Sequence, residues 1–103
     1  MPAYVFVEVE ITDNAAQAEY RQRSVGVIEA YGGRIMARGD VVESSAGEPS
    51  SRRRMLALEF PTLEQARAWR DLSQASAEQS EVRSIRNRMG NVVSINIVEG
   101  ETD

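Results

Sequence analysis

The sequence predicts one α+β domain with a ferredoxin-like βαββαβ order, in which a four-stranded antiparallel sheet carries two helices on one face. Three observations predict this fold. Four segments alternate apolar and polar residues as strands do, two segments have helical spacing, and 103 residues suffice for a single domain. We therefore expect one domain over residues 1–103, with the first and third strands at the centre of the sheet.

The first half of the chain contains a strand, a long helix and a second strand. Residues 3–11 alternate valine and isoleucine with other side chains, which predicts a strand. Asp13 is the expected N-cap of a helix over residues 14–31, which two glycines end. The apolar stripe of this helix contains Ala16, Tyr20, Val27 and Tyr31. A short strand is expected over residues 34–39.

The second half repeats this pattern. A third strand is expected over residues 53–60. Thr62 and Gln65 have the spacing of a capping box and predict the start of a second helix. Its apolar face contains Leu63, Ala66, Trp69 and Leu72, and helical spacing resumes with Val82, Ile85 and Met89. A turn at Gly90 leads into a last strand over residues 92–98.

Two segments lack a regular pattern. Residues 40–51 are rich in Ser, Gly and Pro, which predicts a flexible loop and the most mobile internal segment of the chain. We expect limited proteolysis to cut first at or beside Arg52–Arg54, where this loop ends. Residues 99–103 form a polar tail.

The composition excludes several kinds of chemistry. The chain has a net charge of −4, no cysteine and no histidine, and all twelve of its basic residues are arginine. Disulfides, thiolate nucleophiles, Schiff-base lysines, a P-loop lysine and a Ser-His-Asp triad are therefore impossible. No carboxylate spacing resembles a metal site and no cofactor motif is present, so we expect neither a metal nor a cofactor.

The composition also bears on partners and location. An acidic balance argues against nucleic acid as a partner. RNA-recognition motifs share the βαββαβ order, but they need stacking aromatics on the third strand, which here offers Met55, Ala57 and Glu59. No apolar run reaches the roughly 18 residues of a membrane span, and the first residues lack the pattern of an export signal. We expect a cytoplasmic protein without a membrane partner.

Strand parity divides the sheet into two faces. The face expected beneath the helices contains Val5, Val7, Val9, Ile11, Leu56, Leu58, Phe60, Val93, Ile95 and Ile97. The opposite face contains Tyr4, Phe6, Glu8, Glu10, Met36, Arg38, Met55, Ala57, Glu59, Ser94 and Asn96. Because this second face mixes apolar and ionisable residues, we expect it to meet another subunit or to line a ligand cleft.

The charges on the second face suggest a substrate clamp. Arg38 is expected to hold a carboxylate or enolate oxygen while Glu59, or else Glu8, moves a proton. The alternative is an interfacial salt-bridge network without chemistry, since a buried charge needs a partner. The residues expected to contact a ligand are Tyr4, Phe6, Glu8, Arg38, Met36, Asn96 and Trp69.

Trp69 and the arginine run before the third strand each have two interpretations. Trp69 could close a pocket, but its helical spacing favours packing between helix and core. The run Arg52-Arg53-Arg54 could bind phosphate, and a solvated cluster at the loop edge is the alternative.

Four segments together resemble a known family. They are Ala3–Val9, Tyr31–Gly39 with its Gly-Gly-Arg and Ala-Arg-Gly, Leu58–Pro61, and Ala66–Trp69. This set is similar to the domain of unknown function 1330 family, small bacterial proteins of the dimeric α/β-barrel superfamily. The resemblance extends from Ala3 to about Gly100. It implies a homodimer in which two sheets face each other.

The resemblance leaves two function classes open. Relatives in the superfamily include cofactor-free monooxygenases, muconolactone isomerases and EthD-like proteins, whereas the family itself has no settled activity. One hypothesis is therefore a cofactor-free enzyme or binder for a small apolar or carboxylated metabolite. The other is a dimeric module without catalysis.

Overall fold

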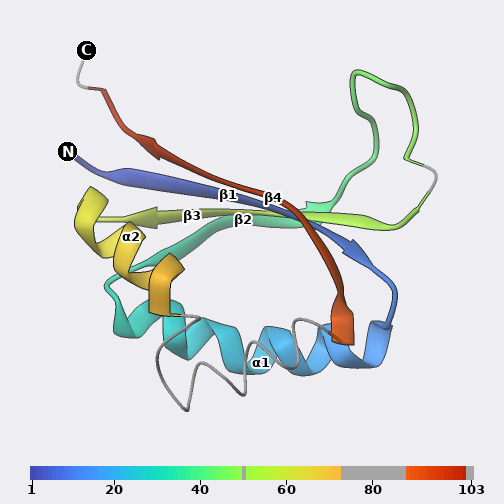
Figure 1. The fold of residues 1–103 in the computed structure, drawn as a ribbon, viewed down its shortest axis with the longest axis horizontal. Helices are drawn as coiled ribbons and strands as arrows, with labels where there is room; N and C mark the ends of the chain where they lie inside the picture. Colours follow the sequence, from blue (N-terminus) through green and yellow to red (C-terminus); the bar gives the residue numbers. More distant parts are fainter. Residues whose placement is uncertain (50, 73–87, 102–103) are drawn as a thin grey trace.

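The computed structural model describes residues 1–49, 51–72 and 88–101 and has the predicted ferredoxin-like architecture (Figure 1). In chain order its elements are β1 (Ala3–Ile11), α1 (Asn14–Ala30), β2 (Arg34–Asp40), β3 (Arg53–Phe60), α2 (Leu63–Leu72) and β4 (Gly90–Glu99). Within the described ranges, no helix is both long and apolar enough to cross a membrane.

All neighbouring strands of the sheet run antiparallel, in the order β2-β3-β1-β4. The first and third strands are therefore central, as the sequence predicts. Both helices lie on the same side of the sheet, so the domain has two layers (Figure 1).

The hydrophobic core fills the space between the sheet and the helices. Val5, Leu58 and Phe60 are the largest fully buried side chains. The Phe60 and Trp69 rings pack with their centroids 5.8 Å apart, so Trp69 takes the helix-packing position that its spacing predicts. The other buried hydrophobic residues are Ala3, Val7, Val9, Ile11, Ala16, Val27, Ile28, Ala66 and Met89.

Capping interactions fix the ends of both helices. Asp13 Oδ1 accepts a hydrogen bond from the Ala16 amide at 3.0 Å, which confirms the predicted N-cap of α1. The chain leaves α1 through Gly32, whose φ of 81° suits glycine. At α2, Thr62 Oγ1 accepts from the Gln65 amide, and the Gln65 side chain donates to the Tyr31 carbonyl. This last bond joins the start of α2 to the end of α1.

The last strand begins earlier than the sequence predicts. Gly90 is not a turn residue but the first residue of β4, where it pairs with Ile11. A Cβ at Gly90 would overlap the Glu10 carbonyl, so only glycine permits this close approach. Met89 is buried in the core, whereas the predicted helical positions Val82 and Ile85 lie outside the described residues.

Each edge strand contains one extra residue, and these two bulges alter the predicted faces. In β2, Ile35 pairs with Leu58 and Ala37 with Ala57, so Met36 is extra. In β4, the register shifts opposite Glu8 and Val9, which leaves Val93 extra. The residue opposite Val9 is consequently Val92, where the sequence analysis expected Val93.

Candidate functional site

The sheet face opposite the helices, here called the open face, is left uncovered by the described parts of the chain (Figure 1). The strand register arranges it in four rows that run across the strands. From one end to the other, they are Arg34–Glu59–Tyr4–Val98, Ala37–Ala57–Phe6–Asn96, Gly39–Met55–Glu8–Ser94 and Arg53–Glu10–Asn91. Charged residues therefore lie towards the two ends, and apolar or small residues lie between them.

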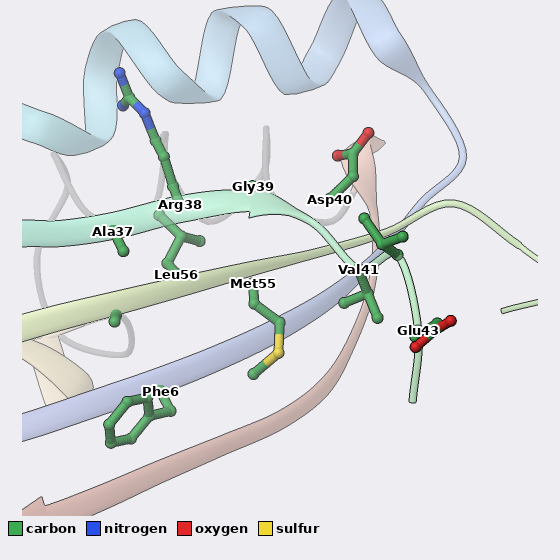
Figure 2. A pocket seen from close by; sticks show the side chains of 11 residues that line it. Phe6, Ala37, Arg38, Gly39, Asp40, Val41, Glu43, Met55 and Leu56 are labelled. Carbon is green, nitrogen blue, oxygen red and sulfur yellow. The ribbon is translucent and has the colours of Figure 1, made fainter. Parts of the chain in front are cut away.

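Arg38 does not lie on this face, so the prediction that places it there, on the edge strand beside the strand of Glu59, is wrong. The extra residue Met36 reverses the parity of the rest of β2, and Arg38 pairs with Leu56 on the helix side of the sheet. Figure 2 shows its side chain directed towards α1, away from Phe6 and Met55. A single bulge thus removes the expected anion anchor from the open face.

Two other arginines neutralise the glutamates that Arg38 was expected to hold. Arg34 Nε lies 2.7 Å from Glu59 Oε1, and Arg53 Nη1 lies 2.9 Å from Glu8 Oε2. Sequence reasoning missed both arginines. Strand parity puts Arg53 on the same face as Met55 and Glu59, so its position could have been predicted from the sequence. The position of Arg34 depends on which residues pair between β2 and β3, and parity alone does not give this pairing.

Glu10 of the central strand β1 binds Ser51, which lies at the end of the loop before β3. Its carboxylate accepts hydrogen bonds from Asn91 Nδ2 at 3.1 Å and Ser51 Oγ at 2.9 Å. These bonds, together with the charge of Arg53, lower the pKa of Glu10. Glu10 is therefore a structural residue at one end of the open face.

Asp40 binds two of the three arginines in the run Arg52-Arg53-Arg54 at the edge of the sheet. Arg52 Nε donates to Asp40 Oδ2 at 3.3 Å, and Arg54 Nη1 donates to Asp40 Oδ1 at 3.1 Å. The hydrogen bond from Arg52, followed by the smaller effect of Arg54, lowers the pKa of the Asp40 carboxyl. Because Arg53 binds Glu8, each arginine of the run has an acidic partner, and the arrangement does not favour a phosphate site.

A hollow of about 420 Å³ opens on the open face beside β2 (Figure 2). We call it the sheet hollow. Small residues make the space, namely Ala37, Gly39 and Ala57, while Phe6 and Met55 form apolar walls. Four residues at the end of β2 and in the segment after it complete the rim: Asp40, Val41, Val42 and Glu43. Sequence reasoning missed these rim residues, which have no strand parity.

The remaining predicted ligand residues do not gather at this hollow. Tyr4 lies in the row of Glu59, and Asn96 pairs with Phe6 on the far side from β2. Met36 lines a different hollow beside α1, and Trp69 lies in the helix layer. Of the seven predicted ligand residues, Phe6 and Arg38 line the sheet hollow, and the Arg38 side chain points away from the Phe6 ring.

The described residues contain no group of three or more acidic side chains placed to hold a metal ion. The site is instead an apolar hollow on a sheet whose charges are paired within the chain. This geometry defines the class of protein: a two-layer α+β domain of ferredoxin-like topology, with one covered and one open sheet face (Figure 1). Residues 2–101 match the family described as domain of unknown function (DUF1330), and the chain belongs to that family. No curated protein matches it.

Several solved structures are similar to this chain. Rv0793 from Mycobacterium tuberculosis is 12% identical with a TM-score of 0.55, and the match covers 100% of this chain and 98% of that one. An ethyl tert-butyl ether d (EthD) family protein from Bacillus halodurans is 14% identical with a TM-score of 0.56 and coverages of 98% and 100%. A NIPSNAP family protein from Agrobacterium tumefaciens is 11% identical with a TM-score of 0.59 and coverages of 95% and 90%. At these identities the likeness concerns the fold.

Proposed function

We propose that the protein is a homodimer whose two open faces meet and hold a small, mainly apolar molecule in the sheet hollow. The observation that carries the proposal is the sheet hollow itself: an apolar space of about 420 Å³ on a face that the described chain leaves bare. A second copy of the chain would roof this space and separate its contents from water.

The size and chemistry of the open face support a second copy as its cover. Phe6, Met55 and Val98 are 36%, 39% and 47% exposed on it, a cluster of apolar surface that water solvates poorly. The face spans all four strands of the sheet, so it offers a second copy a continuous surface. The internal Arg–Glu pairs would enter such an interface already neutralised.

The charges around the sheet hollow favour an uncharged occupant over a carboxylate. Arg34 and Arg53 are engaged by glutamates, and Arg38 points to the other side of the sheet. The acidic residues Asp40 and Glu43 lie at the rim. Because Arg52 and Arg54 already engage the Asp40 charge, Glu43 is the rim residue that would repel an anion, so an apolar ligand is better supported than a carboxylated one.

The open face favours binding over catalysis. Glu59, predicted to move a proton, lies in the row next to the sheet hollow but does not line it. Its pairing with Arg34 supports the alternative of a dimeric module without chemistry, because the pair needs no ligand to neutralise it. The role of Glu59 as a proton-transfer residue stays a prediction, whereas Arg38 is not proposed as its anchor, because Arg38 points to the helix side of the sheet (Figure 2).

Light scattering tests the dimer. We expect a mass twice that of the 11.4 kDa chain, and Phe6→Asp should return a folded monomer because it places an unpaired carboxylate at the centre of the interface. A wild-type monomer at tens of micromolar would overturn the proposal of a dimer.

Binding of Nile red, an uncharged apolar dye, tests the sheet hollow. Ala57→Phe should fill the space and reduce the affinity for the dye at least tenfold while the dimer persists. Ala68→Phe, on the exposed side of α2, is the matched control and should leave the affinity unchanged. Equal affinities for the dimeric wild type and Ala57→Phe would exclude the sheet hollow as the binding site.

A further inference from the structure

The bulge in the edge strand β2 has a consequence on the helix side of the sheet. Met36 is an extra residue in the pairing with β3, and the register after it turns Arg38 towards α1 (Figure 2). Bulges re-aim side chains and are frequent next to functional sites. The position of Arg38 is therefore set by a specific irregularity of the backbone.

Arg38 borders two spaces between α1 and β2. One is an open groove of about 480 Å³, here called the edge groove, whose apolar surface comes from Val25, Ile28, Ile35 and Met36. The other is a small adjoining cavity, which Arg38 lines together with Arg21 of α1. A cationic corner thus adjoins an apolar surface.

The charges at this corner are not balanced within the described chain. Arg34 and Arg54 also border these spaces, but Glu59 and Asp40 engage them. The side chains of Arg21 and Arg38 make no hydrogen bond or ion pair with any residue of the ranges 1–49, 51–72 and 88–101. Glu29 is the one acidic residue among the described residues that line the edge groove.

We propose that the edge groove, together with the adjoining corner formed by Arg21 and Arg38, binds a small organic carboxylate with an apolar tail. The carboxylate would lie between the guanidinium groups of Arg38 and Arg21, whose planar forks suit two-point contact with its oxygens. The tail would lie along the apolar surface that α1 and β2 provide. Net charge does not drive this binding, because the chain carries −4; the local placement of two arginines whose side chains have no partner among the described residues does.

This site is independent of the proposed function. It lies on the helix side of the sheet, whereas the dimer and the sheet hollow use the open face (Figure 2). A dimer formed through the open face would leave both edge grooves accessible.

Calorimetric titration of the purified full chain with octanoate tests the proposal. We expect saturable binding of one octanoate per chain. Arg38→Met and Arg21→Met should each weaken it about tenfold or more, since each removes a charge-assisted contact while keeping an apolar stem. Arg67→Met, which removes an exposed arginine of α2, is the matched control and should bind like the wild type.

Two comparisons separate recognition of the carboxylate from unspecific binding. Octanol has the same tail without the charge and should bind at least tenfold more weakly than octanoate. Arg38→Lys keeps the charge but loses the planar fork, and an affinity between those of the wild type and Arg38→Met is expected. Octanoate binding that is unsaturable, matched by octanol or unchanged in Arg38→Met would overturn the proposal.

The two proposals fail in different ways. Arg38→Met should keep the dimer mass and the Nile red affinity, and Ala57→Phe should keep the octanoate affinity. Circular dichroism of each variant establishes that a loss of binding is not a loss of fold.

Discussion

The two faces of the sheet are built from the same strands but from different sets of side chains. On the helix side, Val5, Leu58 and Phe60 are at most 1% exposed and contain no polar atom beyond the backbone. On the open face, the neighbouring residues Phe6 and Met55 are more than one-third exposed and lie between paired ions.

The difference indicates what each face is adapted to contact. A face that is apolar throughout can be covered by helices of the same chain, because covering it removes no charged side chain from water. A face whose charges are neutralised in place can be covered later, by a second molecule, at a smaller desolvation cost than bare charges would require. The following predictions test this contrast, beginning with the largest expected effect.

Removing one aromatic ring from each face compares the faces directly. Phe60→Ala should lower the free energy of unfolding by about 3–5 kcal/mol, because it leaves a cavity in the core. Phe6→Ala should cost the isolated chain less than about 1 kcal/mol but weaken the dimer. Urea unfolding at two protein concentrations separates these effects, since only dimer-linked stability varies with concentration. A loss for Phe6→Ala as large as that for Phe60→Ala, at both concentrations, would contradict the contrast.

An arginine on the open face tests the importance of paired charges. Arg34→Met should raise the dimer dissociation constant at least tenfold, because it leaves the Glu59 carboxylate unpaired in the interface. The stability of the monomer should change by less than about 1 kcal/mol, since the Arg34 side chain is 68% exposed. Sedimentation velocity measures the dissociation.

A double variant provides the control for this prediction. Arg34→Met combined with Glu59→Gln leaves no unpaired charge and should recover most of the lost association. If the double variant dissociates as readily as Arg34→Met alone, the pair does not act through charge.

The N-cap of α1 tests how firmly the helix layer is held. Asp13→Ala should lower the free energy of unfolding by about 1 kcal/mol, because the amide of Ala16 loses its acceptor. Asp13→Ser keeps an acceptor and should restore most of this stability. Thermal unfolding of the three proteins measures the effect, and equal melting temperatures would mean that the cap contributes nothing.

The smallest expected effect is a pH dependence at the rim of the sheet hollow. Arg52 and Arg54 lower the pKa of Asp40 in the folded chain, so the charged form stabilises the fold above about pH 4. This contribution should disappear as the pH falls through the lowered pKa and Asp40 takes up a proton. Asp40→Asn should therefore melt below the wild type at pH 7, and the difference should shrink as the pH falls below about 4. A melting difference that does not shrink on acidification would exclude this linkage.

The sequence was sufficient for the topology and for the central strands. Clean alternation over β1 and β3 predicts both of their faces correctly, because each position keeps its parity along an unbroken strand. The edge strands could not be predicted in the same way. Met36 and Val93 have the same apolar character as regular strand residues, so no signal marks them as extra.

For the residues of the candidate site, the sequence predicted the correct sheet face only where strand parity alone determines that face. Phe6 lies on the open face as predicted, and Arg38 lies on the other side because it follows a bulge. The pairing of Arg34 with Glu59 depends on which residues stand opposite each other, and a single sequence carries no such information. The sheet hollow also needs the small residues of two strands to be adjacent in space.

The two bulges also restrict how copies of this chain can associate. An open sheet has unpaired backbone groups along both outer strands, where another strand could add and continue without end. Here each outer strand is interrupted by an extra residue, Met36 on one side and Val93 on the other. A strand with a kink is a poor template for further pairing. The bulges therefore disfavour further strands adding along the sheet edges, and the proposed association through the open face would close at two subunits instead of forming a fibre.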